Sequence, residues 1–198
     1  AGSNIVDDGS RFIYSYFQTS TTVAQFWRYD TFADSWQQLA TPATQTGTVG
    51  NMVYSKSIGG QFSGQVFGAV YLFIGNGTAA YFYKYDISTE TWTKLTDSPA
   101  NFGAGGVLKS VDGIIYAIRG ATTNLMWRYN IERASWELPS VGLFGTEFRG
   151  TDYLGFTTGA DIVRGDGNYL YITRGNYDNL FVRYNTVTGE AVHMTPAP

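Results

Sequence analysis

Few side chains of this 198-residue chain could support acid–base, nucleophilic or metal chemistry. His193 is the sole histidine and there is no cysteine, which excludes thiolate metal sites and cysteine nucleophiles. Asp7 and Asp8 are adjacent, so strand alternation would point them to opposite sides and make them a poor acid–base pair. No Ser-His-Asp set has a convincing context. The sequence therefore predicts no catalytic residue, no metal and no cofactor, and His193 is expected to be a surface or packing residue.

Three short motifs could hold a ligand or a modification, but each has a simpler explanation. Asp161, Asp166 and Asp178 could help to hold Ca²⁺, although no dense loop of oxygen ligands surrounds them. The tripeptide Arg-Gly-Asp that begins at Arg164 matches an adhesion motif, but it falls on a predicted turn. Asn76 opens a glycosylation sequon, and an Asn-Gly hairpin turn explains the same residues more simply.

The composition indicates an all-β protein. Aromatic residues make up 17% of the chain and favour strands, while the 24 glycines favour turns. No segment shows a sustained apolar period of 3.6 residues. The net charge of −3 comes with no evident basic face, so no nucleic-acid partner is expected. No apolar run reaches about 18 residues, so no membrane insertion is expected.

A ten-residue phrase recurs along the chain and marks its organisation. It reads WRYDTFADSW at 27–36, YKYDISTETW at 83–92 and WRYNIERASW at 127–136, with a weaker copy around Tyr184. In each copy a basic residue precedes a tyrosine, Asp or Asn follows it, and in three copies a tryptophan stands seven residues beyond it. These residues are Tyr29, Trp36, Tyr85, Trp92, Tyr129, Trp136 and Tyr184, with Ala191 at the tryptophan position of the fourth copy.

A second set of tyrosines lies 13 to 15 residues before the first set, at Tyr14, Tyr71, Tyr116 and Tyr171. Asp-Gly pairs stand before three of them, at Asp8-Gly9, Asp112-Gly113 and Asp166-Gly167. An Asp-Gly pair between apolar runs predicts a tight hairpin, because such a turn requires positive φ. Each unit therefore reads as four short strands. In the third unit these are expected at 105–110, 113–118, 125–129 and 135–138.

Four such units fill the chain, at approximately 1–42, 43–99, 100–140 and 156–198, and are interpreted as one domain over 1–198. A period of about 45 to 50 residues with four strands per unit is typical of a β-propeller blade. Four blades are few. Either they close a ring alone, or two chains combine their blades, because an open arc would expose the apolar faces of its end blades.

The repeat resembles the kelch repeat. The shared features are a small-residue pair after the first strand, an aromatic second strand ending in Gly, then Tyr-Asp and a Trp six residues later, and residues 105–139 are the best copy. The family's usual double Gly is reduced to one, at Gly75, Gly120 and Gly175. The resemblance implies an all-β, kelch-like β-propeller with four four-stranded antiparallel blades. Galactose-oxidase-like kelch enzymes need paired His and Tyr ligands and a Cys cross-link, which this chain lacks.

The repeated aromatic residues are interpreted as structural, since a catalytic site rarely needs four copies. They are expected to fill the space between facing blades, where each buried ring contributes about 2–3 kcal/mol. The basic residue before each tyrosine is expected to bond to carbonyls or to the Asp of an adjacent blade.

The repeat is interrupted twice by insertions of about ten residues, at 57–68 and 139–159. One follows a first strand and the other follows a fourth strand, so they are expected to project from opposite faces of the disc. Both carry aromatic residues in Gly-rich settings. These rings either form a contact surface or fold back to fill gaps in the blades. The partner-binding candidates are Phe62, Phe67, Phe144, Phe148, Tyr153 and Phe156.

Three functions are compatible with this pattern. The favoured one is a non-enzymatic structural or protein-interaction subunit that binds protein partners or self-assembles, as in a virion or an extracellular surface structure. Low Lys content, abundant Gly, Thr and Tyr, and the absence of Cys fit that setting. The alternatives are a carbohydrate-binding module whose exposed rings stack on sugars, and an enzyme related to the kelch class.

Overall fold

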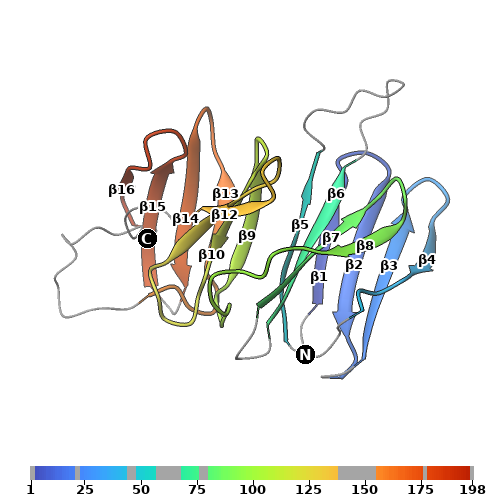
Figure 1. Cartoon of the computed structure of the whole chain (residues 1–198). Helices are drawn as coiled ribbons and strands as arrows, with labels where there is room; N and C mark the ends of the chain where they lie inside the picture. The colour runs from blue at the N-terminus through green and yellow to red at the C-terminus, as the bar shows by residue number, and fades with distance from the viewer. Residues whose placement is uncertain are drawn as a thin grey trace. The chain divides into compact units, whose positions relative to one another are not determined.

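The computed structural model describes residues 3–20, 23–43, 48–56, 68–75, 80–137, 155–175 and 178–196 (Figure 1). Within these ranges the chain forms strands and no helix. The strands make four four-stranded antiparallel sheets, each ordered as the strands follow one another in the chain. The predicted all-β class with four such sheets is confirmed. No helix of the described ranges is long and apolar enough to cross a membrane.

The chain divides into two compact units, and the prediction of one domain over the whole length stays a prediction. The first unit is Ala1–Asn101 with Ile131–Ala134, and the second is Phe102–Asn130 with Ser135–Pro198.

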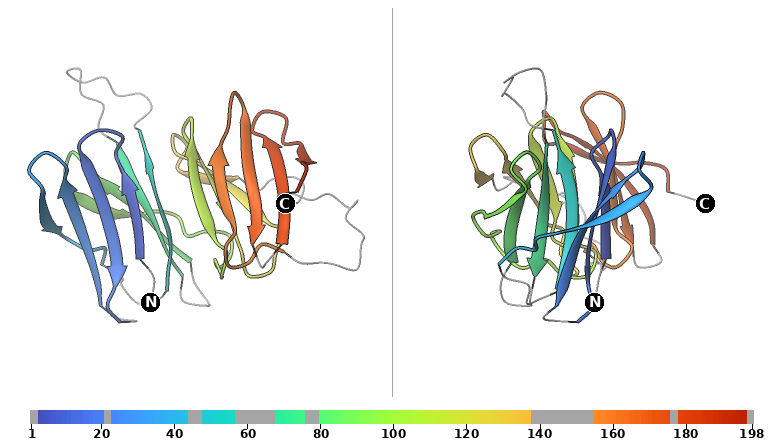
Figure 2. Two further views of the ribbon diagram at one scale, coloured as in Figure 1. Left: turned by 180° about the vertical axis from the view of Figure 1, so that it is seen from behind. Right: turned by 90° about the vertical axis from the view of Figure 1, so that its right-hand side faces the viewer.

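The first unit contains sheets 1 and 2. Sheet 1 consists of β1 (Ser3–Asp7), β2 (Phe12–Gln18), β3 (Ala24–Asp30) and β4 (Ser35–Leu39). Sheet 2 consists of β5 (Thr48–Ser55), β6 (Ala69–Gly75), β7 (Ala80–Asp86) and β8 (Thr91–Lys94). Each sheet has the twist usual for antiparallel strands of this length, which is visible in Figure 2.

The second unit contains sheets 3 and 4. Sheet 3 consists of β9 (Val107–Val111), β10 (Ile114–Ile118), β11 (Met126–Asn130) and β12 (Ser135–Glu137). Sheet 4 consists of β13 (Asp161–Arg164), β14 (Tyr169–Gly175), β15 (Asp178–Asn185) and β16 (Ala191–His193). The strands expected for the third repeat unit therefore agree with β9–β12 to within two residues at each end. The predicted Asp112-Gly113 hairpin is confirmed, with φ of 48° and 82°.

In every sheet the strand register places the same repeated side chains on the same two faces. We call the face that carries the second-strand tyrosine face A; there Tyr14 pairs with the basic residue Arg28 across β2 and β3. We call the face that carries the third-strand tyrosine face B; there Tyr29 pairs with Trp36 across β3 and β4. The same pairings recur in sheets 2 and 3, whereas in sheet 4 Ala191 takes the place of the tryptophan.

In both units the core forms where face A of one sheet meets face B of the next. In the first unit, Tyr14, Tyr16 and Phe26 on face A of sheet 1 share a buried cluster with face B of sheet 2. In the second unit, face A of sheet 3 shares a buried cluster with face B of sheet 4, and the rings of Tyr116 and Tyr184 lie 6.1 Å apart. The repeated pattern thus produces one kind of sheet-to-sheet contact twice.

Candidate binding surface on the first sheet

The turn between β3 and β4 of sheet 1 is held by the side chain of Asp30. Its Oδ1 accepts hydrogen bonds from the backbone N–H groups of Phe32 at 2.9 Å and Ala33 at 3.2 Å. Asp86 in sheet 2 and Asn185 in sheet 4 accept equivalent bonds from their own turns. The repeated Asp or Asn is therefore a turn-forming residue, because its side chain can bond to backbone groups two and three positions later.

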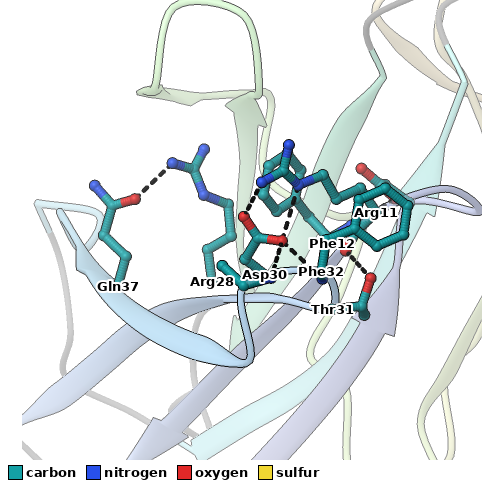
Figure 3. Close-up of polar contacts among 9 residues, drawn as sticks. Arg11, Phe12, Arg28, Asp30, Thr31, Phe32 and Gln37 are labelled. Carbon is teal, nitrogen blue, oxygen red and sulfur yellow. Dashed lines mark hydrogen bonds and ion pairs between the residues drawn. The ribbon is translucent and has the colours of Figure 1, made fainter.

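Arg11 adds a contact that is specific to sheet 1 (Figure 3). Its Nε donates to Oδ1 of Asp30 at 2.8 Å, and its Nη2 pairs with Oδ2 of the same carboxylate. The guanidinium carbon lies 5.2 Å from the ring centre of Phe12 and 5.4 Å from that of Phe32. The Phe32 side chain is 81% exposed, so the arrangement presents an accessible aromatic ring beside an ion pair.

The Arg11 guanidinium holds the pKa of Asp30 well below its ordinary value of 3.8, although desolvation opposes this shift. A carboxyl group whose pKa is depressed by folding stabilises the fold above its ordinary pKa and loses that contribution as the pH falls below it. We therefore expect Asp30→Asn, which keeps the oxygen that holds the turn, to weaken the decrease in melting temperature below about pH 4. Arg11→Gln should change it in the same direction, because it removes the cation that is the main cause of the lowered pKa. Melting curves of both variants and the wild type between neutral and acid pH measure this, and an unchanged acid dependence would contradict it.

Arg28 connects the two sheets of the first unit. Its Nη1 donates to Oε1 of Glu90, in the turn between β7 and β8, at 2.8 Å, and its Nη2 donates to Gln37 at 2.6 Å. The basic residue of the repeat was expected to contact a carbonyl or an Asp of the adjacent blade. For Arg28 the acidic partner is instead Glu90, while Lys84 pairs with Asp86 in its own sheet.

Face B of sheet 1 carries an apolar, aromatic surface that belongs to neither core cluster of the described residues. Trp36 is 52% exposed and Ile5 is 67% exposed, while Ile13, Trp27 and Tyr29 are half-buried. The rings of Tyr29 and Trp36 lie 5.0 Å apart. Large apolar side chains that share one sheet face without cover indicate a contact surface.

The same repeat positions are buried in the other sheets. At the position of Tyr29, the tyrosines 85, 129 and 184 are 1%, 1% and 4% exposed. The tryptophans 92 and 136 are half-buried, and the indole of Trp92 donates to the backbone oxygen of Ala40 at 2.7 Å. The expectation that the repeated aromatic residues fill the space between sheets is therefore wrong for Trp36, because no described side chain lies across face B of sheet 1.

Tyr29 and Asp34 place a polar group at the edge of this surface. The Tyr29 hydroxyl donates to Oδ1 of Asp34, and this hydrogen bond raises the pKa of Tyr29 above its ordinary value. Asp34 has φ of 49°, and Glu90 occupies the equivalent turn position of sheet 2 with φ of 55°. An acidic side chain therefore stands at the same place beside face B in both sheets of the first unit.

Of the six partner-binding candidates, five lie outside the described residues: Phe62, Phe67, Phe144, Phe148 and Tyr153. Phe156 is 1% exposed and belongs to the core cluster of the second unit. Its backbone pairs with Thr123 in an isolated bridge. Phe156 therefore fills space inside the unit and is not available as a surface contact, which is the second of the two roles considered for the insertions.

The residues considered for a metal or an adhesion site belong to the strands and turns of sheet 4. Within the described ranges, no three His, Asp or Glu side chains lie close enough together to hold a metal ion. Arg164, the first residue of the Arg-Gly-Asp sequence, is engaged by Asp112 through two hydrogen bonds of 3.1 and 3.0 Å. His193 is half-buried, and burial lowers its pKa.

Arg11 and Phe32 were missed by the sequence reasoning, which examined insertions instead of substitutions. A usable signal was present, because the equivalent positions of the other units hold different residue types. Gly68, Gly113 and Asn168 stand where sheet 1 has Arg11, and Ser88, Glu132 and Val187 stand where it has Phe32.

Comparison with solved structures gives the fold. The chain resembles the structure of YjhT with a TM-score of 0.63 at 15% identity, covering 98% of this chain and 65% of that one. For TolB from Acinetobacter baumannii the TM-score is 0.58 at 13% identity, covering 100% and 43%. For the SapL1 lectin in complex with alpha-methyl fucoside it is 0.59 at 13% identity, covering 97% and 63%.

These neighbours are β-propeller folds, so the predicted propeller class is confirmed. The chain spans less than two thirds of the length of each of these three proteins. No protein-family model and no curated protein sequence matches the chain, so membership of the kelch family stays an interpretation of its repeat.

Proposed function

We propose that the chain is a non-enzymatic, kelch-like propeller component that acts as a structural or protein-interaction subunit, with face B of sheet 1 as its main contact surface. One observation carries this proposal. Trp36, Tyr29 and Trp27 occupy positions whose counterparts in the other sheets are more deeply buried, yet in sheet 1 they remain accessible. A position that keeps core-type side chains without cover is expected to be covered by a partner.

The chemistry of the surface favours a protein partner. Ile5 and Ile13 add branched aliphatic side chains to the aromatic ones, and Trp and Tyr are the residue types that contribute most often to the centre of protein interfaces. Asp34 at the edge supplies a charge that could set the orientation of the partner.

A second candidate function is carbohydrate binding. Phe32 is 81% exposed beside the Arg11–Asp30 ion pair, which would allow a sugar ring to stack on the phenyl ring while its hydroxyl groups bond to charged side chains. The similarity to a lectin fold is compatible with this function, although at 13% identity it concerns the fold alone.

A glycan array separates the two functions. We expect no glycan signal that depends on this sheet, so that wild type, Trp36→Ala and Phe32→Ala give the same array pattern. The physical reason is that Tyr29 and Trp36 are flanked on face B by Ile13, and that the polar groups near the exposed rings already bond to one another, Asp34 to Tyr29 and Arg11 to Asp30. Thr93→Ala, on the exposed part of β8, serves as the matched control. A glycan bound by the wild type and by Thr93→Ala, but lost in Trp36→Ala or Phe32→Ala, would replace the proposal with a lectin function.

A further inference from the structure

Two sheet faces stand out when the four sheets are compared position by position. One is the accessible face B of sheet 1, and the other is face A of sheet 4. Tyr171 and Phe181 are half-buried on face A of sheet 4, Thr173 is exposed and Val163 is 53% exposed. The corresponding residues of sheet 1 that belong to the core, Tyr14, Phe26 and Tyr16, are each 0% exposed.

These two faces are of opposite kinds, and the structure shows how opposite faces combine. Within each unit the core joins face A of one sheet to face B of the next. The accessible face of sheet 4 is an A face, and that of sheet 1 is a B face. The face A to face B contact that the chain makes once in each unit could therefore also form between face A of sheet 4 and face B of a sheet 1.

The charges at the edges of these faces are complementary. In the first unit, Arg28 on face A of sheet 1 pairs with Glu90 beside face B of sheet 2, with 2.8 Å between nitrogen and oxygen. In sheet 4 the position of Arg28 is taken by Arg183, and in sheet 1 the position of Glu90 is taken by Asp34. A contact of the same geometry would therefore bring Arg183 and Asp34 together as an ion pair.

The aromatic residues at the equivalent positions could also make equivalent contacts. Phe26 lies 4.9 Å from Tyr85 and 5.0 Å from Trp92, measured between ring centres, where face A of sheet 1 meets face B of sheet 2. In the new contact Phe181 would take the place of Phe26, and Tyr29 and Trp36 would take those of Tyr85 and Trp92. The exposed Trp36 would thereby be covered.

We propose that face A of sheet 4 in one copy of the chain binds face B of sheet 1 in a second copy, with Arg183 opposite Asp34. This proposal rests on the proposed function and names its partner. A second copy is the fitting occupant because each copy carries both faces, with complementary charges at their edges. The contact is head-to-tail, so copies can join into a closed ring or a longer series.

The test exchanges the two charges between separate chains. Asp34→Arg alone would place two arginine side chains opposite each other, and Arg183→Asp alone would place two aspartate side chains opposite each other. Each variant should therefore self-associate about tenfold more weakly than the wild type or worse. An equimolar mixture of the two variants restores opposite charges at every contact between unlike chains. We expect sedimentation and light scattering to show assemblies larger than 21.8 kDa for the wild type and for the mixture at concentrations at which either variant alone is still a monomer.

Two further variants serve as controls. Asp166→Arg makes the same charge change in the exposed turn between β13 and β14, and should self-associate like the wild type. Asp34→Asn tolerates the left-handed backbone at this position and removes only the charge, so it gives a weaker but measurable loss if Asp34→Arg folds poorly. Circular dichroism spectra verify the fold of each variant.

Other outcomes overturn the inference. A wild type of 21.8 kDa at every concentration would exclude a second copy as the occupant. Variants that lose stability as monomers, with no rescue on mixing, would place Arg183 and Asp34 in contact within one chain. Neither outcome would refute a protein-interaction role of face B, which the glycan array on Trp36 tests separately.

Discussion

Phe26→Ala is expected to destabilise the first unit by about 3–5 kcal/mol. The side chain is 0% exposed and lies at the centre of the contact between sheets 1 and 2. Its ring centre is 4.9 Å from that of Tyr85, 5.0 Å from Trp92 and 5.9 Å from Tyr14. Truncation would leave a cavity bordered by rings that cannot close it without losing their own contacts. Urea unfolding followed by circular dichroism and tryptophan fluorescence measures the loss.

Phe181→Ala is the matched control for this prediction. Phe181 occupies the same repeat position in sheet 4, but it is half-buried on an accessible face, so its removal leaves no closed cavity. We expect it to cost less than half as much stability in dilute protein. Because the chain has two compact units, the transitions should be fitted separately where they separate. Equal losses for the two variants would contradict the assignment of Phe26 to the core and Phe181 to the surface.

Gly120→Ala is expected to destabilise the second unit by about 2–5 kcal/mol, of which about 1–2 kcal/mol is backbone strain and the rest steric overlap. Gly120 has φ of +68° and lies two residues after the end of β10. A Cβ at this position would lie 2.4 Å from the backbone oxygen of Ala104 and 2.5 Å from the backbone nitrogen of Gly106. Neither neighbour is a flexible side chain, so the backbone itself would have to move.

Gly167→Ala separates the two contributions. Gly167 has φ of +60°, but a Cβ there would meet no atom within 4 Å. We expect this variant to lose only the strain contribution, about 1–2 kcal/mol. Thermal and urea unfolding of both variants measure the two losses of stability. A loss at Gly120 no larger than that at Gly167 would show that the close approach of the 104–106 backbone relaxes at little cost.

Much of the fold could be predicted from the sequence because it depends on local relationships. The Asp-Gly turns and the alternation of apolar residues predicted β9–β12 nearly to the residue, since turn chemistry and strand period act over a few positions. The repeated Asp30 and Asn185 bond to their own turns, which is again a local effect. The structural role of the third-strand tyrosines fits the burial of Tyr85 and Tyr184 for the same reason: an alternating strand has one definite face.

The candidate site could not be predicted in this way. Insertions with aromatic residues suggested contact surfaces, yet Phe156 lies in a core, and the other five candidates are outside the described residues. The ion pair between Arg11 and Asp30 joins residues that are 19 positions apart, and only the pairing of β2 with β3 brings them together. In the sequence, Arg11 is set apart only by comparison with Gly68, Gly113 and Asn168 at the equivalent positions of the other units.

Trp36 and Trp92 show most clearly how local and long-range effects divide. Both stand seven residues after a tyrosine, in a fourth strand, paired with that tyrosine across the ladder. The repeat alone was enough to specify this local geometry, the sheet to which each tryptophan belongs and the face on which it lies. Their burial differs only because of the three-dimensional arrangement: Trp92 is half-buried and bonded to Ala40, while Trp36 is 52% exposed. The physical reason is that strand register is set by neighbours in the chain, whereas burial depends on which sheet lies across the face.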